Sequence, residues 1–283
     1  MTPLVSDAPI VSIADLTVSY VGADRPAIDG LDLEIAAGEY VGIIGLNGAG
    51  KTTLGLCLNG VVPHAIPADV TGKLLVAGID PRTRRVQDTA RTVGVVFDNP
   101  EYQLSQLTVV EEVAFGLENL GVDPAEMPAR IAEALALVGL EDVEERSPLS
   151  LSGGQQQRLA LASVLVMRPT VLFLDEPTAY LDPVGKADML AIADRLHGED
   201  GMTVIVADHE VEALAEIADR IVVLDAGRVV MDGPPAQVLA RVEELAKREL
   251  RVPQVTQFAH ALRPDAQDLP VTVEGALAWL GAG

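Results

Sequence analysis

Apolar runs of four or five residues recur along the chain, separated by longer stretches whose apolar positions repeat with a helical period. Short runs rich in β-branched residues that alternate with helical patterns are typical of α/β proteins with a largely parallel sheet. We therefore predict five buried core strands: Tyr40–Ile44, Val93–Phe97, Val171–Leu174, Thr203–Ala207 and Ile221–Leu224.

The segments around these strands predict two further parts of the fold. Val11–Tyr20 and Leu31–Ile35 flank a polar turn at Gly22–Pro26, which favours an antiparallel β subdomain. The helical pattern from Glu101 to Met167 is clearest in Glu111–Leu120 and Pro128–Val138. Because this block lies between two core strands, we expect an inserted helical subdomain at about residues 100–168.

The pattern changes again near residue 235. Gly233–Pro235 breaks helices and strands, and Ala236–Arg251 predicts one charged helix. We expect a main domain over residues 1–235 and a small helical extension over residues 236–283, which is a candidate dimerisation element.

No stretch of the sequence predicts a membrane-spanning helix. Such a helix needs ~20 consecutive apolar residues, and the most apolar stretch, Leu159–Met167, is closed early by Arg168 and Pro169. The first residues also lack the basic start of a secretory signal. We therefore expect a chain that reaches a membrane only by docking to a protein already there.

Composition and charge narrow the function classes. The 283 residues contain 20 basic and 42 acidic side chains, a formal net charge of −22, which argues against a nucleic acid as main partner. The single cysteine, Cys57, excludes a disulfide framework and a cysteine-rich metal site. We expect Cys57 in the core and a reducing, cytoplasmic compartment.

A phosphate-binding loop follows the first core strand. The pattern G-x-x-x-x-G-K-[ST] is matched by eight consecutive residues: Gly45, Leu46, Asn47, Gly48, Ala49, Gly50, Lys51 and Thr52. The strand Tyr40–Ile44 enters the loop and a helical segment, Lys51–Asn59, leaves it, as this motif requires. Backbone amides and the helix N-terminus would face the phosphates, Lys51 would reach the β- and γ-phosphates, and the Thr52 hydroxyl could ligate Mg²⁺. Our candidate ATP-binding residues in this loop are Gly45, Asn47, Gly48, Ala49, Gly50, Lys51, Thr52 and Thr53.

Two later motifs decide which kind of nucleotide hydrolase this is. Leu151-Ser152-Gly153-Gly154-Gln155 is the LSGGQ signature, and Val171–Glu176 is an apolar strand that ends in two carboxylates. Together with the loop, their order and spacing resemble the ATP-binding cassette (ABC) ATPase family over roughly residues 10–235. The resemblance implies an α/β P-loop fold of the ABC type, with a RecA-like core, an antiparallel β subdomain and an inserted helical subdomain.

The resemblance also implies roles for single residues. Asp175 would hold Mg²⁺, and Glu176 would be the general base that polarises the attacking water. His209 matches the switch histidine that contacts the γ-phosphate, and Tyr20 matches the aromatic residue that stacks on adenine. Asp182 matches the end of the D-loop, which communicates between two sites.

The signature residues point to a second copy of the domain. In the family, Ser152, Gly153, Gly154 and Gln155 contact ATP held by the opposite subunit, because a helix N-terminus without bulky side chains suits a γ-phosphate. The active unit is then a head-to-tail homodimer or heterodimer with two composite sites.

Two regions resemble a narrower group. Val96–Gln103 and Thr108–Asn119 are similar to the Q-loop and following helix of energy-coupling factor (ECF) transporter ATPases, which power vitamin or cobalt and nickel uptake. Thr178–Pro183 and Val252–Leu262 also look like that group. The resemblance implies a peripheral ATPase at the cytoplasmic face of the membrane, with a T-type subunit and a substrate-binding membrane subunit as partners.

Asp98 departs from the family pattern, which has glutamine at this position next to Mg²⁺ and the attacking water. A carboxylate can accept a hydrogen bond from a Mg²⁺-bound water but cannot donate one as an amide does. Three interpretations stay open: a tolerated variant that contacts the metal, a slow site in a heterodimer, and an inactive site.

An ATPase of another ABC importer stays open as an alternative function. A soluble ABC ATPase of DNA repair or translation would need a long coiled-coil insert or a second P-loop, and the sequence has neither. Glu176 counts against a non-hydrolysing regulatory module, whereas Asp98 keeps that alternative open. On the helix within Asp98–Asn119 we expect Val113, Phe115 and Leu117 to form an exposed apolar face for a membrane subunit. The Arg82–Arg85 cluster predicts a solvated turn, and Glu141–Glu145 predicts an exposed helix end.

Overall fold

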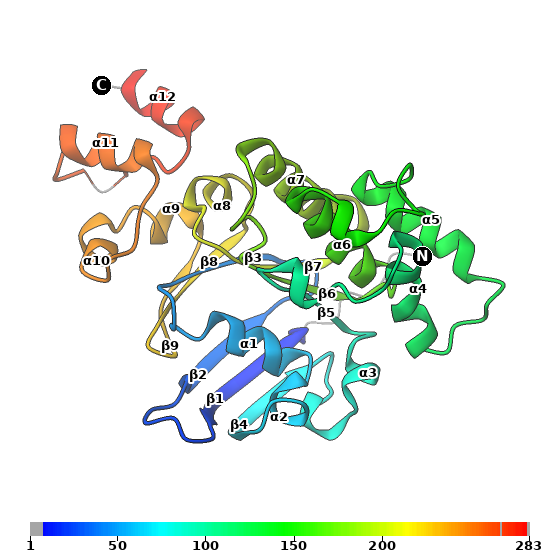
Figure 1. Cartoon of the computed structure of the whole chain (residues 1–283). Helices are drawn as coiled ribbons and strands as arrows, with labels where there is room; N and C mark the ends of the chain where they lie inside the picture. Colours follow the sequence, from blue (N-terminus) through cyan, green and yellow to red (C-terminus); the bar gives the residue numbers. More distant parts are fainter. Residues whose placement is uncertain (1–7, 267, 282–283) are drawn as a thin grey trace.

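A computed structural model describes residues 8–266 and 268–281, so the outer ends of both expected domains lie outside the described residues. Its core is a six-stranded sheet in the order β5-β6-β7-β3-β8-β9 (Figure 1). Neighbouring strands are parallel except β8 and β9. The strands are β3 (Tyr40–Ile44), β5 (Val93–Val96), β6 (Val171–Asp175), β7 (Thr203–Ala207), β8 (Arg220–Asp225) and β9 (Arg228–Gly233). All five predicted core strands are confirmed to within two residues at each end.

Both faces of this sheet are covered, which explains its uninterrupted apolar strands. Tyr40 and Ile44 of β3 pack on one side against the helices, whereas Val41 and Ile43 pack on the other. Helix α1 (Lys51–Leu58) lies on this second side, between the core sheet and a smaller sheet (Figure 1). Cys57 of α1 is fully buried there, as expected.

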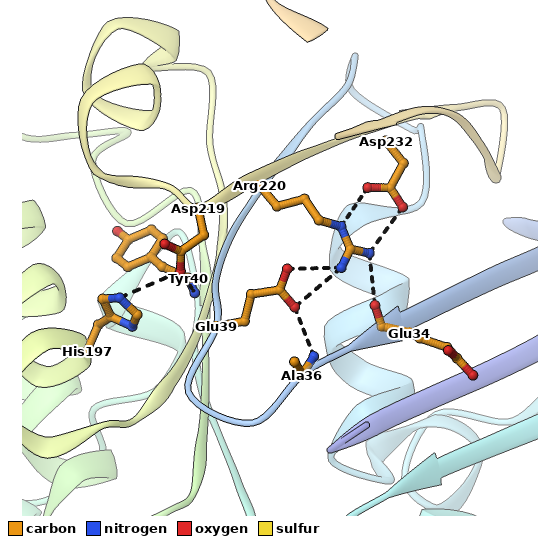
Figure 2. Close-up of polar contacts among 8 residues, drawn as sticks. All are labelled: Glu34, Ala36, Glu39, Tyr40, His197, Asp219, Arg220 and Asp232. Carbon is orange, nitrogen blue, oxygen red and sulfur yellow. Dashed lines mark hydrogen bonds and ion pairs between the residues drawn. The ribbon is translucent and has the colours of Figure 1, made fainter. Parts of the chain in front are cut away.

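The smaller sheet has three antiparallel strands in the order β2-β1-β4, which confirms the antiparallel β subdomain. Its strands are β1 (Val11–Tyr20), β2 (Ile28–Ile35) and β4 (Ala68–Val76), the last of which the sequence pattern did not reveal. Arg220 of the core sheet connects the two sheets: its guanidinium donates hydrogen bonds to the Glu34 carbonyl of β2 and to the carboxylates of Glu39 and Asp232 (Figure 2).

The inserted helices form one end of the molecule (Figure 1). They are α4 (Val109–Asn119), α5 (Met127–Val138) and α6 (Gly153–Leu165), which pack on one another. The expectation of an exposed face on α4 was wrong in part. Val113 and Leu117 are fully buried and only Phe115, 44% exposed, faces solvent, because α5 and α6 cover the other side of the helix.

The expected single helix over Ala236–Arg251 was also wrong. The chain forms two short helices, α9 (Pro235–Val238) and α10 (Val242–Ala246), followed by α11 (Gln254–Leu262) and α12 (Val273–Gly281). Leu239 and Leu245 are both fully buried. One straight helix would turn these two side chains about 120° apart around its axis, so tertiary packing breaks the helix between them.

Two charged clusters also differ from expectation. Arg82 is not simply solvated, because its guanidinium pairs with Asp80 and donates to the Val70 and Gly72 carbonyls. Glu141–Glu145 forms a turn beyond α5 and not a helix end, since Gly139 in the left-handed region ends that helix.

The remaining helices are α2 (Val61–His64), α3 (Val86–Thr89), α7 (Pro183–Asp200) and α8 (Val211–Ile217), and short 3-10 turns lie at Pro81–Thr83, Pro100–Tyr102 and Pro148–Ser150.

Within the described part of the chain, no helix is both long and apolar enough to span a membrane.

Candidate active site

The predicted phosphate loop connects β3 to α1 at the carboxyl edge of the core sheet. Two of its glycines are required by close packing: a Cβ on Gly45 would lie 2.4 Å from the Leu224 carbonyl oxygen, and one on Gly50 would lie 2.7 Å from that of Ala27. Gly50 also has a φ of 107°, which side chains rarely allow. The backbone of this loop therefore keeps its path only with glycine at these positions.

The loop borders a cavity of about 320 Å³. The cavity is lined by most of the candidate ATP-binding residues and by three acidic side chains: Asn47, Gly48, Gly50, Lys51, Thr52, Thr53, Asp98, Asp175 and Glu176, with Ala27 and Leu46. Ala49 is instead buried in the core, and Gly45 borders a neighbouring cleft of about 930 Å³ with His209. Residues far apart in sequence thus share one concave site.

Lys51 is the only lysine or arginine among the residues that line this cavity. Its buried ammonium donates to the Gly45 carbonyl at 2.8 Å and lies 3.4 Å from Oε1 of Glu176. Because three carboxylates face the same space, Asp98, Asp175 and Glu176, the cavity favours cations or a ligand that brings them.

Asp175 ends β6 and is almost completely buried, with 3% of its surface exposed. Burial raises its pKa to about 6, and the charges of Glu176 and Asp98 add to this rise. A hydrogen bond from Thr52 and the charge of Lys51 act in the opposite direction. Oδ1 of Asp175 has no hydrogen-bond partner among the residues that the structure describes, so it is free to bind a ligand.

Glu176 follows directly and adopts a left-handed backbone conformation, with a φ of 46°. Residues other than glycine adopt this conformation at an energetic cost, and here the Glu176 N–H holds it by donating to the Ala207 carbonyl at 2.7 Å. Oε1 of Glu176 reaches Nε2 of His209 at 3.0 Å, and 47% of the His209 side chain is exposed.

The remaining candidates lie outside the cavity. Tyr20 is half-buried and its hydroxyl forms a hydrogen bond of 3.1 Å with the Thr53 hydroxyl, so it borders the loop from β1. The signature residues form the N-terminus of α6, where Ser152 and Gln155 cap each other's backbone amides. Asp182 caps α7 by accepting from the Gly185 amide at 2.7 Å. Within one copy of the chain, the signature residues and Asp182 do not line the cavity.

Thr178 and Asp208 were not among the predicted site residues, yet they are almost fully buried beside Glu176 and His209. The signal that could have revealed Asp208 is its place at the end of an apolar strand, directly before the candidate histidine.

Known proteins share this fold. The family described as ABC transporter matches residues 28–179. The chain is 46% identical over 251 residues to the energy-coupling factor transporter ATP-binding protein EcfA1 of Symbiobacterium thermophilum, a match that covers 88% of this chain and 85% of that protein.

Two solved structures are similar to most of this chain. CbiO1 from Clostridium perfringens, described as part of the ABC transporter complex cbiONQ, has a TM-score of 0.73 and 32% identity, covering 89% of this chain and 99% of that one. The dimeric ATP-binding cassette MJ0796 bound to ADP and Pi has a TM-score of 0.69 and 27% identity, covering 80% and 98%.

Proposed function

Because the chain belongs to the ABC transporter family and is an ATP-binding ATPase of that family, we propose that it powers an importer of the energy-coupling factor type. The names of its relatives support this assignment, since one is an energy-coupling factor ATPase and another is part of an ABC transporter complex. One observation in particular supports ATP hydrolysis by this chain: Lys51 and His209 both contact the same carboxylate oxygen of Glu176.

ATP would lie with its phosphates along the loop from Gly45 to Thr53. The loop amides and the N-terminus of α1 would face the β- and γ-phosphates. Lys51 would exchange its contacts with the Gly45 carbonyl and Glu176 for phosphate oxygens, which bear more negative charge. Tyr20, which its bond to Thr53 places beside the loop, would stack on adenine.

The site also suits Mg²⁺, which prefers oxygen ligands. The fit rests on Oδ1 of Asp175, a buried carboxylate oxygen without a partner among the described residues, and on the Thr52 hydroxyl bonded to the same side chain. Thr52 and Asp175 would hold the ion, and Asp98 would face it. When bound, Mg²⁺ supplies charge neutralisation at the β- and γ-phosphates.

Glu176 and His209 would act on the attacking water. The Glu176 carboxylate would accept a proton from the water as it attacks the γ-phosphorus atom. The exposed ring of His209 would turn toward the γ-phosphate while it stays near Glu176. Phosphoryl transfer depends mainly on positioning and charge neutralisation, and Lys51 with the loop amides would provide the latter.

A second copy of the chain or a related subunit would complete each site. Ser152, Gly153, Gly154 and Gln155 lie at a capped helix N-terminus outside their own cavity, where they could meet ATP of the opposite subunit. Asp182 and the D-loop would face the same interface. Binding of two ATP molecules would then close the dimer and hydrolysis would open it.

We place the chain at the cytoplasmic face of the membrane, docked on a T-type subunit and a substrate-binding subunit. Large apolar side chains are exposed in the segment that would receive them, namely Tyr102, Leu107 and Phe115. Exposed apolar side chains gathered in one segment mark interaction surfaces. The transported vitamin or metal ion would bind the membrane subunits and not this chain.

The variant Glu176→Gln tests the hydrolytic assignment. We expect a loss of ATP turnover of at least 100-fold in the assembled transporter, with binding of Mg²⁺–ATP retained and a closed dimer accumulating. The amide keeps the shape of the side chain but is a far weaker base. The control Glu216→Gln changes an exposed carboxylate on α8 that does not line the cavity, and it should keep turnover within a few-fold. Near-normal hydrolysis by Glu176→Gln would overturn the assignment.

A further inference from the structure

Two chain segments run side by side beyond the ends of β6 and β7, and three contacts join them. The Glu176 amide donates to the Ala207 carbonyl, the Thr178 hydroxyl donates to Oδ2 of Asp208 at 2.8 Å, and the His209 ring reaches Glu176. The second contact is buried, and together with the first it holds the two segments against each other. The third lies at the exposed end, where the proposed chemistry occurs.

Asp208 is a buried carboxylate with both oxygens bonded. Its Oδ1 accepts from the backbone amides of His209 at 2.6 Å and Glu210 at 3.1 Å, while Oδ2 accepts from Thr178. Its exposed fraction is 3% and that of Thr178 is 1%. Burial raises the pKa of Asp208, and these three hydrogen bonds lower it. A buried carboxylate is costly unless it is hydrogen-bonded, so such an arrangement needs all of its partners.

We propose that Asp208 is a positioning residue that fixes the loop carrying His209 so that the imidazole ring reaches Glu176. The proposal deepens the function proposed above and uses the role given there to His209. Asp208 does not line the phosphate cavity, and its hydrogen bond with His209 is accepted from the backbone amide and not from the ring. It therefore acts through the histidine and not on the nucleotide.

A second contact holds the same loop from the other side. Lys186, in the first turn of α7, forms an ion pair with Glu210, the residue after His209. The loop is thus tied to the Thr178–Lys186 stretch by a buried hydrogen bond and by a half-exposed ion pair. His209 lies between Asp208 and Glu210, the two residues that make these contacts, and its side chain extends into solvent. The ring is therefore the part of the loop that can move.

Hydrogen-bond chemistry distinguishes two substitutions at this position. Asp208→Asn keeps one oxygen for the two backbone amides and can donate from its nitrogen to the Thr178 hydroxyl. Asp208→Ala loses all three bonds and leaves two partly buried amides without that acceptor. If hydrogen bonds position the loop, the first variant should behave nearly as the parent protein and the second should not.

The imidazole signals of His209 test the positioning directly, in nucleotide-free full-length protein observed by nitrogen–proton NMR. In the parent protein, Glu176→Gln should shift these signals, because the two side chains are in contact. The same change should have at most a small effect in the Asp208→Ala background and should keep its effect in Asp208→Asn. An undiminished response in Asp208→Ala would overturn the proposal, even if the protein remains fully folded.

Asp219 offers a matched control at the opposite edge of the core sheet. It accepts from the Tyr40 amide at 2.8 Å and lies 3.6 Å from the His197 ring, so it also joins a backbone amide to a histidine (Figure 2). Asp219→Ala should leave the response of His209 to Glu176→Gln intact. Loss of the response in this control would mean that general loosening, and not positioning by Asp208, explains the result.

ATP turnover in the assembled transporter gives an independent readout. We expect Asp208→Ala to lower the rate at saturating ATP at least tenfold and to change ATP affinity by less than twofold. The double variant Asp208→Ala with His209→Ala should turn over ATP no more slowly than the slower of the two single variants, because both changes remove the same function. If the rate losses of the two single variants multiplied in the double variant, the proposal would be overturned. If His209→Ala itself keeps the parent rate, the role proposed for His209 is wrong, and the NMR response alone decides the role of Asp208.

Discussion

Asp98 brings a third carboxylate to the phosphate cavity, where the resemblance predicts an uncharged glutamine. It faces the same space as Asp175 and contributes to the raised pKa of that residue. An anion about 4 Å from a cation interacts by roughly 4 kcal/mol per pair of unit charges at an effective dielectric constant of ~20. This exceeds the ~1.4 kcal/mol that changes a rate or an affinity tenfold, so the carboxylate should strengthen metal binding.

We predict that Asp98→Asn and Asp98→Gln each raise the Mg²⁺ concentration needed for half-maximal ATP turnover by about tenfold. Binding of Mn²⁺ to the ATP-loaded protein, measured by electron paramagnetic resonance, should weaken in parallel. Glu101→Gln serves as the control, because Glu101 is an exposed carboxylate on the same loop that does not line the cavity. Superimposable Mg²⁺ titrations for the parent and both Asp98 variants would mean that Asp98 has no part in metal binding.

At the scale of single elements, α4 shows how one helix divides its apolar side chains between core and surface. A capping box formed by Thr108 and Glu111 starts the helix. Val113 and Leu117 then pack into the core, whereas Phe115 stays 44% exposed. An aromatic side chain left half in solvent on a well-packed helix suits a partner that covers it.

We predict that Phe115→Glu abolishes co-purification with the membrane subunits and leaves folding and ATP binding intact. The charge would have to be buried without a partner in the interface, which is unfavourable. Val21→Glu is the matched control, since Val21 is an exposed apolar residue in the turn after β1. Thermal unfolding and ATP affinity verify the folded state of both variants. Unchanged co-purification of Phe115→Glu would rule out docking at this helix.

At the scale of the whole molecule, the two sheets must keep a fixed relation, because β1 supplies Tyr20 and the core sheet supplies the phosphate loop. Arg220 maintains this relation through Glu39, Asp232 and the Glu34 carbonyl, three groups from different segments (Figure 2). Its guanidinium is mostly buried, at 23% side-chain exposure. Removing one partner from such a cluster leaves carboxylates without their counter-charge.

We predict that Arg220→Ala lowers the free energy of unfolding by about 2–4 kcal/mol, as expected when several charge-assisted hydrogen bonds of one mostly buried side chain are lost together. Arg220→Lys should retain only part of the stabilisation that Arg220→Ala loses, because an ammonium cannot bond three groups in one plane. The control is Arg228→Ala: its pair with Asp29 also joins the two sheets but is exposed, so its loss should cost below about 1 kcal/mol. Urea unfolding of the three variants measures this, and equal losses for Arg220→Ala and Arg228→Ala would contradict it.

Residues that act within a short stretch of chain could be predicted from the sequence. The phosphate loop could be predicted because the motif places glycine where the backbone needs it, as at Gly50, whose φ of 107° is rarely open to other residues. The core strands could be predicted for a similar reason, because strands covered on both faces remain apolar at every position. The site roles assigned to these residues remain predictions that the variants above test.

Only the tertiary structure decided which distant residues meet. Nothing in the sequence pairs Thr178 with Asp208, or Lys51 and His209 with one oxygen of Glu176, because these contacts depend on the lateral order of β3, β6 and β7 in the sheet. Packing likewise divided the expected helix at Leu239 and buried two of the three apolar side chains expected to be exposed on α4. Sequence determines the local backbone through steric and hydrogen-bonding preferences, whereas the contacts between segments follow from how the whole chain buries its apolar surface.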